Sequence, residues 1–339
     1  MNFKRLGNTD IETSVIGLGC WAIGGWMWGG TEESEAVAAI QAAPDAGINL
    51  IDTAPMYGFG RSEEIVGKAI RGRRDRYVVA TKCGLRWDTK PWPEGKGTLH
   101  FYSTKTATVT DASQAEYYVY KYLRPESIRE EVELSLRRLG TDYIDLLQTH
   151  WQDGTTPLDD SVGMMFRLKE EGKIRAVGCS NATVEQIQCY RRIGPLDVDQ
   201  ERLSLLDRDV LTNGQLDACR EGGVSFLAYS PLANGILSGK FAPDQAFKHG
   251  DLRSVRPRFD AESIRRTNAK LDRLKPLANA YGLTIAQLAI AWVAAKYEKM
   301  HVLVGARSPG RVFENAGAGA VELKADDVVE IERLFDGNK

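Results

Sequence analysis

The sequence predicts a single (β/α)8 TIM barrel, and two observations indicate this fold class. From residue 31 onward, stretches with apolar residues three and four positions apart, which are typical of surface helices, alternate with short apolar runs of strand length. Regular alternation of this kind is typical of a parallel sheet covered by helices. The apolar runs number about eight, and eight strands close a barrel. We therefore expect one domain over residues 1–339.

The expected elements follow one another along the chain. Residues 3–6 and 12–14 flank the turn-forming stretch 7–10, which predicts an N-terminal β-hairpin, and residues 15–19 form the first buried strand. Pro44 should kink the first helix or end it early. The expected helices are 34–46, 62–70, 127–139, 159–171, 184–191 and 325–335. The later strands end at Asp52, Lys82, His150, Ser180, Gln200 and Tyr229, and the last strand, 301–304, leads into Arg307.

Composition and charge restrict the class of protein. Hydrophobic residues make up 43% of the chain, which is ample for one large core, and a net charge of −2 offers no surface for nucleic acid. With neither a leader pattern nor an apolar run of membrane-spanning length, no membrane partner is expected. Five cysteines without a C-x-x-C pair favour a reducing compartment. We expect a soluble cytoplasmic protein without a metal site, either a monomer or a homo-oligomer.

The stretch that begins at Asp52 is the first indication of an active site. Asp52 ends the apolar run 48–51, Tyr57 follows in the next turn, and Lys82 ends the apolar run 77–81. A phenol beside an ammonium that is held by a carboxylate can act as a proton donor. Taken alone, Asp52 would more often be a cap or turn residue and Tyr57 a half-buried packing residue.

The recurrence of this pattern favours an active site. Nearly every predicted strand is followed by a reactive or hydrogen-bonding side chain, and in a parallel barrel all carboxyl ends of strands lie on one face, where active sites of this fold are built. These side chains are Asp52, Lys82, His150, Ser180, Asn181, Gln200, Tyr229, Ser230 and Arg307. We interpret them as one site.

Six stretches resemble the motifs of the aldo-keto reductase family, in the family's order and over most of the chain. They are 51–58 (IDTAPMYG), 80–82 (ATK), 145–151 (DLLQTHW), 172–181 (GKIRAVGCSN), 229–232 (YSPL) and 305–309 (GARSP). The loop 21–30 and the segment 58–63 most resemble the bacterial general-stress reductases of that superfamily. No G-x-G-x-x-G motif follows the first strand in the arrangement of a doubly wound dinucleotide-binding sheet.

The resemblance implies reduction of a carbonyl compound by NADPH, with Tyr57 as the general acid. Because a phenol with a pKa of about 10 is a poor donor near neutrality, we expect Lys82 to lower the pKa of Tyr57. Asp52 would keep Lys82 charged and oriented. His150 would orient the carbonyl oxygen or assist proton transfer, unless it is only a structural hydrogen-bonding residue.

The resemblance also assigns residues to the nicotinamide half of the cofactor. Ser180, Asn181 and Gln200 would bind the nicotinamide carboxamide, and Tyr229 would stack on the ring. Small residues after the Tyr229 strand would admit the pyrophosphate, with positive charge from Lys240. The residues assigned to these parts of the cofactor are Gly19, Cys20, Trp21, Asp52, Ser180, Asn181, Gln200, Tyr229, Ser230, Pro231, Leu232, Gly235, Leu237, Ser238, Gly239 and Lys240.

The adenosine half of the cofactor is assigned to the segment after the last strand. Arg307 and Arg311 would bind the 2′-phosphate, for which a guanidinium is well suited, unless the two arginines are only a solvated helix face. The full set here is Gly305, Arg307, Ser308, Arg311, Glu314 and Asn315, the last two at the adenine.

An aromatic-rich insertion over residues 83–124 is the most individual part of the chain. A loop of this length is usually functional or disordered, and its many aromatic residues argue against disorder. We expect a hairpin over 98–109 that forms one wall of the substrate pocket; the alternative is a contact between subunits. The expected substrate-binding residues are Trp21, Trp28, Tyr57, Trp87, His150 and Trp151. The tryptophans of the loop 21–30 could instead simply pack the barrel mouth.

Three functions are consistent with these observations. The first is an NADPH-dependent oxidoreductase that reduces an aldehyde or ketone, such as a sugar, a small aldehyde or a bulkier cyclic ketone. The second is a non-catalytic NADPH-binding barrel that acts as a regulatory or partner-binding subunit. The third, a lyase or isomerase that uses Lys82 as a Schiff-base amine, has no need of Arg307 and Arg311. The presence of all four catalytic residues favours the first.

Overall fold

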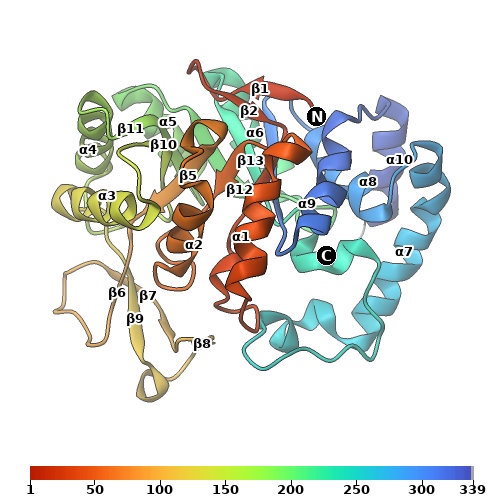
Figure 1. The fold of residues 1–339 in the computed structure, drawn as a ribbon, viewed down its shortest axis with the longest axis horizontal. Coiled ribbons are helices and arrows are strands. Elements are labelled where there is room, and N and C mark those ends of the chain that lie inside the picture. Colours follow the sequence, from red (N-terminus) through yellow and green to blue (C-terminus); the bar gives the residue numbers. More distant parts are fainter. Residues whose placement is uncertain (337–339) are drawn as a thin grey trace.

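In the computed structural model, which describes residues 1–336, eight parallel strands form a closed barrel. Around the barrel the order is β10, β11, β12, β13, β14, β3, β4 and β5, and β5 pairs with β10. The bounds are β3 Ile16–Gly19, β4 Leu50–Asp52, β5 Val78–Cys83, β10 Ile144–Thr149, β11 Ile174–Ser180, β12 Val198–Arg202, β13 Ser225–Tyr229 and β14 Met300–Gly305. The predicted fold class is confirmed (Figure 1).

The predicted N-terminal hairpin closes one end of this barrel. Strand β1 (Phe3–Arg5) pairs antiparallel with β2 (Glu12–Ser14). Leu6 and Ile11, from the turn between them, are buried in the same apolar cluster as Leu50 of the barrel interior. In Figure 1 the hairpin lies at the top, opposite the insertion and the loop before α7 at the bottom. The accessible end of the barrel is therefore the one at which the strands finish.

The helices cover the outside of the barrel. Their bounds are α1 Glu33–Ala42, α2 Arg61–Ile70, α3 Pro125–Leu139, α4 Leu158–Glu170, α5 Val184–Ile193, α6 Gln215–Gly222, α7 Ala261–Ala280, α8 Ile285–Ala294, α9 Pro309–Ala316 and α10 Ala325–Phe335. The first helix ends at Ala42, before a 3-10 turn at Pro44–Ala46, as Pro44 predicts. Helices α6, α7, α8 and α9 were not among the expected helices. Residues 286 and 288–293 of α8 are all buried, so this helix has no polar face to give a periodic signal.

The insertion forms a small antiparallel sheet. Its strands, in spatial order, are β6 Leu85–Asp88, β9 Tyr117–Lys121, β7 Thr98–Ser103 and β8 Thr108–Val109. The expected hairpin over 98–109 is confirmed as β7 and β8, whereas β6 and β9 were not foreseen. Aromatic contacts join this sheet to the barrel: the ring of Phe101 stacks on Trp26 with centroids 5.9 Å apart, and Phe59 stacks on Tyr117 at 4.4 Å.

A buried carboxyl group anchors the base of the insertion. The N–H of Gly84, the first residue after β5, donates to both side-chain oxygens of Glu131 on α3 at 3.2 and 3.1 Å. Gly84 has a φ of +91°, and a Cβ on it would lie 2.3 Å from a methyl carbon of Leu123. The position therefore requires glycine. Burial raises the pKa of Glu131 to about 7.

We expect Glu131→Gln to gain stability relative to the wild type as the pH rises from 5 to 8. The pKa of Glu131 is raised from 4.5 to about 7 on folding, so the stability that its protonation contributes is present below pH 4.5 and is lost as the pH rises through 7. This shift corresponds to about 3 kcal/mol, and glutamine keeps an oxygen that can accept from Gly84. Urea unfolding at pH 5 and pH 8 measures the difference; a stability difference that does not change with pH would contradict the assignment.

Among residues 1–336, no single helix is long and apolar enough to cross a membrane. Helices α7 and α8 taken together pass this test of length and composition, but they are bent by 81° relative to each other.

Candidate active site

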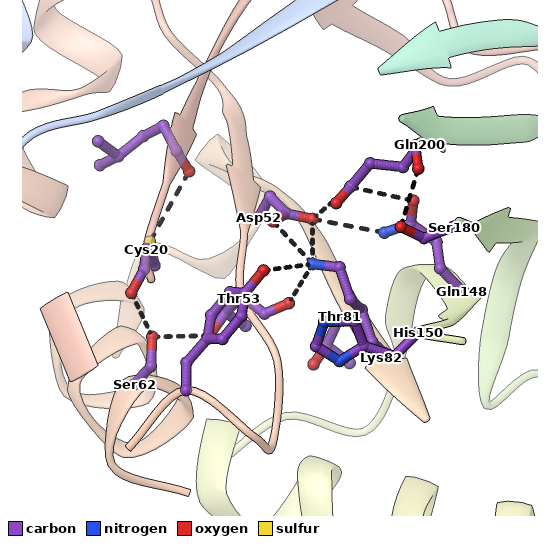
Figure 2. A network of polar contacts seen from close by, with 12 residues as sticks. Cys20, Asp52, Thr53, Ser62, Thr81, Lys82, Gln148, His150, Ser180 and Gln200 are labelled. Carbon is purple, nitrogen blue, oxygen red and sulfur yellow. Dashed lines mark hydrogen bonds and ion pairs between the residues drawn. The ribbon is translucent and has the colours of Figure 1, made fainter. Parts of the chain in front are cut away.

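Lys82, at the end of β5, is the centre of a buried polar network. Its Nζ donates to both carboxylate oxygens of Asp52 at 2.8 Å and to the carbonyl oxygen of Thr53 at 3.0 Å. It also lies 3.3 Å from the phenol oxygen of Tyr57. Lys82 is 1% exposed and Asp52 3% exposed, so the ion pair is shielded from water. The structure thus brings together Asp52, Tyr57 and Lys82, three of the four predicted catalytic residues, and Figure 2 labels Asp52 and Lys82.

Two glutamines complete the hydrogen bonding of Asp52. Gln200 Nε2, from β12, donates to Asp52 Oδ1 at 2.9 Å, and Gln148 Nε2, from β10, approaches the same oxygen at 3.4 Å. Gln148 was not predicted. Its signal in the sequence is an amide at an inward position of a strand, two residues after the interior Leu146 and two before His150. The two amide groups hold the carboxylate of Asp52 in place, and the carboxylate in turn holds the ammonium of Lys82 (Figure 2).

The pKa of Tyr57 departs from the sequence-based expectation. Burial, and after it the negative charge of Asp52, raises this pKa well above its ordinary value. The expected net lowering of the Tyr57 pKa is therefore not found, because burial and the negative charge of Asp52 outweigh the effect of the neighbouring ammonium. Burial also lowers the pKa of Lys82, although the charge of Asp52 partly opposes this. Tyr57 consequently keeps its proton throughout the neutral range.

His150 lies against Tyr57. The two rings meet edge to face with centroids 5.7 Å apart, and the backbone N–H of His150 donates to the carbonyl oxygen of Cys83 at 2.8 Å. Burial, helped by the charge of Lys82, lowers the pKa of His150 well below its ordinary value. Among the described residues, no hydrogen bond occupies either ring nitrogen. A neutral imidazole with free nitrogens is thus available beside the phenol.

Asn181 links the ends of three strands on the far side of the Tyr57 centre. Its Nδ2 donates to the carbonyl oxygen of His150 at 3.0 Å, and its Oδ1 accepts from the Tyr229 hydroxyl at 2.8 Å. Ser180 Oγ donates to the carbonyl oxygen of Gln200 at 2.8 Å. Asn181 has a φ of +54°, in the left-handed region that asparagine tolerates better than most residues. The predicted nicotinamide-binding residues therefore form one connected group.

The predicted phosphate-binding cations lie together beyond β14. Glu314 accepts from Lys240 Nζ at 2.7 Å and also pairs with Arg311. Arg307 donates to the carbonyl oxygen of Gly30 at 2.9 Å. Asn315 Nδ2 approaches the carbonyl oxygen of Gly305 at 3.4 Å. Arg307 and Arg311 are both exposed, and both line the large cavity that also contains Tyr57.

One cavity of about 1020 Å³ joins the Tyr57 centre to this cationic end. Among the predicted site residues, five lie outside its lining: Cys20, Lys82, Trp87, Leu237 and Gly239. Lys82 lies behind Tyr57, and the ring of Trp87 packs on Phe59 instead, with centroids 5.6 Å apart. Cys20 and Leu237 are fully buried in the core. All other predicted cofactor- and substrate-binding residues line the cavity.

Several lining residues were not predicted. They include Leu85, His100 and Phe101 from the insertion, Lys248 and Arg253 from the loop before α7, and Trp26 and Met56 from other parts of the chain. In the first two segments the signal was a high density of aromatic and basic residues. Arg253 forms a two-point ion pair with Asp251 and lies over the ring of Trp28 at 5.2 Å.

Three loops around the cavity meet at Met27. Its N–H donates to the carbonyl oxygen of Thr106 in the insertion at 2.9 Å, and its carbonyl oxygen accepts from the N–H of Leu252 at 3.0 Å. Met27 has a φ of +63°, which is unusual for a non-glycine residue. The loop 20–30, the insertion and the loop before α7 therefore make a continuous rim.

The shape and chemistry of the cavity fit a dinucleotide. Gly19 and Gly305 are opposite each other on β3 and β14 and both line the cavity; a Cβ on either would make only ordinary van der Waals contact, at 3.8 Å or more. The indole N–H groups of Trp21 and Trp28 have no acceptor among the described residues. No cluster of three or more potential metal ligands occurs in residues 1–336.

The barrel, with Tyr57, Lys82 and Asp52 in contact at its open end, is that of a family of oxidoreductases. The chain belongs to the aldo/keto reductase family: the family model "Aldo/keto reductase family" matches residues 15–336. The resemblance found in the sequence is thus confirmed.

Named relatives cover nearly the whole chain. Aldo-keto reductase YhdN of Bacillus subtilis is 36% identical, over 99% of this chain and 94% of its own length. The NADH-specific methylglyoxal reductase of Escherichia coli is 40% identical, over 98% of this chain and 97% of its own. Among solved structures, the glycerol dehydrogenase AKR11B4 from Gluconobacter oxydans superimposes with a TM-score of 0.84 at 37% identity, covering 98% of this chain and 94% of that one.

Proposed function

We propose that the protein is an NADPH-dependent reductase of aldehydes or ketones, with Tyr57 as the general acid. The observation that carries this proposal is the contact of the Tyr57 hydroxyl with Lys82, whose charge is fixed by Asp52 at the end of a cavity large enough for cofactor and substrate. The names of the relatives, a methylglyoxal reductase and a glycerol dehydrogenase, support interconversion of a carbonyl and an alcohol.

The chain's own residues supply the proton and its control. Bound NADPH supplies a hydride to the carbonyl carbon. The carbonyl oxygen, as it gains negative charge, accepts the proton of Tyr57. Lys82, 3.3 Å away, stabilises the phenolate that remains, and Asp52 holds the ammonium in place. His150, kept neutral by burial, donates a hydrogen bond to the same oxygen.

The residues proposed to hold the cofactor follow the cavity. Ser180, Asn181 and Gln200 bind the carboxamide, and Tyr229 stacks on the nicotinamide. The 2′-phosphate is bound by Arg307 and Ser308 together with Arg311, which exchanges its ion pair with Glu314 for the phosphate. The cationic end supports NADPH, whereas the E. coli relative carries the name NADH-specific, so family membership alone does not decide the cofactor.

We expect Arg307→Ala to weaken NADPH binding by about tenfold while NADH binding changes by less than about twofold, because only NADPH carries the 2′-phosphate. Quenching of tryptophan fluorescence measures both dissociation constants. Arg129→Ala is the matched control, since this arginine pairs with Glu171 on the outside of the barrel. Equal weakening of both cofactors, or of neither, would contradict the phosphate-site assignment.

Turnover distinguishes this function from a non-catalytic NADPH-binding barrel. The wild-type protein is mixed with NADPH or NADH and with aldehydes, aldoses, keto-sugars and polycyclic ketones, and the absorption of the reduced nicotinamide is followed. Loss of absorption with at least one carbonyl is expected. NADPH binding without turnover of any substrate would favour the regulatory barrel.

The proposal extends to the whole chain and its place in the cell. Residues 1–339 are taken as one domain, and the cytoplasm as its compartment. The five free cysteines, Cys20, Cys83, Cys179, Cys189 and Cys219, support a reducing environment.

A further inference from the structure

The insertion contributes one polar side chain to the aromatic end of the cavity. His100, on β7, lines the cavity, and its ring lies 5.0 Å from that of Phe101 and 5.0 Å from that of Trp151. The other side chains that the insertion and the loop 20–30 present there are apolar or aromatic: Trp21, Trp26, Leu85 and Phe101. A single imidazole in such a wall is well placed to select among ligands by hydrogen bonding.

His100 is neutral and has no hydrogen-bond partner among the described residues. Burial, together with the positive charge of Lys121, lowers its pKa to about 4. Lys121 itself does not hydrogen-bond to His100; its Nζ lies over the ring of Trp151 at 5.1 Å. A neutral imidazole has one N–H donor and one acceptor nitrogen, so His100 can bind either a carbonyl or a hydroxyl oxygen.

His100 stands near the reacting centre but is not part of it. His100 and His150 line the same cavity, and the ring of Trp151, the residue after His150, lies 5.0 Å from that of His100. Tyr57 and His150, whose rings are in contact, both serve the reacting carbonyl oxygen in the proposed reaction. A substituent that extends from the reacting carbon into the aromatic end of the cavity would therefore meet the wall that carries His100.

We propose that His100 binds a second oxygen of the substrate, so that the site prefers carbonyl compounds with a hydroxyl or another carbonyl oxygen close to the reacting carbon. This inference rests on the proposed reductase function. An apolar substituent would leave the imidazole without a partner, whereas a hydroxyl would satisfy it. His100 is thus a specificity-determining residue on the insertion, and the insertion determines which carbonyl is reduced.

A matched pair of ketones tests this inference. Hydroxyacetone and butan-2-one differ by a hydroxyl in place of a methyl group, and the ratio of their kcat/KM values reports recognition of that hydroxyl. We expect His100→Leu to lower this ratio by about tenfold, mainly through KM for hydroxyacetone, and to leave butan-2-one within about twofold. His100→Gln, with similar length and a polar end, should retain most of the preference. Thermal melting of both variants verifies that the fold is intact.

The outcomes separate the two proposals. A wild-type protein that turns over no carbonyl overturns the proposed function. A wild-type protein that turns over both ketones, but whose ratio is unchanged in His100→Leu, overturns only the inference about His100. A ratio that falls equally in His100→Leu and His100→Gln overturns it as well, because the loss would then follow from packing of the imidazole rather than from its hydrogen bond.

Discussion

Lys82→Met is expected to abolish measurable turnover and to lower the free energy of unfolding by about 3 kcal/mol. Lys82 is buried with Asp52, and removal of one member of a buried ion pair leaves an uncompensated charge, which typically costs about 3 to 5 kcal/mol. Gln200 and Gln148 still donate to Asp52, so the lower part of that range applies. Urea unfolding and steady-state kinetics measure the two losses.

The double variant Lys82→Met/Asp52→Asn separates stability from catalysis. With both charges removed, no unpaired ion remains, and we expect most of the lost stability to return while turnover does not. This outcome would show that the ammonium is needed for the reaction and not only for folding. Recovery of activity along with stability would contradict the role proposed for Lys82.

Tyr57→Phe is expected to lower kcat by about 10²- to 10⁴-fold, the usual contribution of a positioned general acid. Phenylalanine keeps the ring contacts with Trp21 and His150, whose centroids lie 6.3 and 5.7 Å from that of Tyr57. Cofactor affinity and melting temperature should therefore stay close to those of the wild type. Steady-state kinetics with NADPH and the best carbonyl substrate give the effect.

Tyr143→Phe is the matched control for this substitution. Tyr143 immediately precedes β10, at the closed end of the barrel, and its ring lies under the guanidinium of Arg74 at 4.2 Å. Loss of its hydroxyl should leave kcat unchanged. If Tyr57→Phe were as active as Tyr143→Phe, another group would have to supply the proton.

The barrel could be predicted because its strands and helices leave local signals. Buried strands such as β5 and β10 are short apolar runs, and most outer helices have one apolar face. Helix α8 has no such face because it is buried on all sides, and its periodic signal is lost. Pro44 gave a correct end for α1 because its ring cannot continue the helix.

From the sequence, a residue of the candidate site could be predicted only where it follows the end of a strand. Asp52, Tyr57, Lys82 and His150 are brought together by closure of the barrel, as the fold class implies. The direction of the Tyr57 pKa shift could not be obtained in this way, because it depends on burial and on the distance to Asp52. These quantities exist only in the folded protein.

The insertion shows most clearly what the sequence leaves undecided. The hairpin of β7 and β8 is local, and its β-branched and aromatic residues predicted it. The pairing of β9 with both β6 and β7 joins segments far apart in the chain, for which there is no local signal. For the same reason Trp87 was expected in the cavity although it packs on Phe59, and His100 was overlooked.

A single-turnover measurement tests the central claim most directly. Protein and NADPH in excess are mixed rapidly with a carbonyl substrate, and the absorption of the reduced nicotinamide reports hydride transfer without interference from product release. We expect one rapid loss of absorption in the wild type and in Tyr143→Phe, and a loss at least about 100-fold slower in Tyr57→Phe at equal cofactor occupancy. An equally rapid loss in Tyr57→Phe would contradict the role of Tyr57 as the general acid.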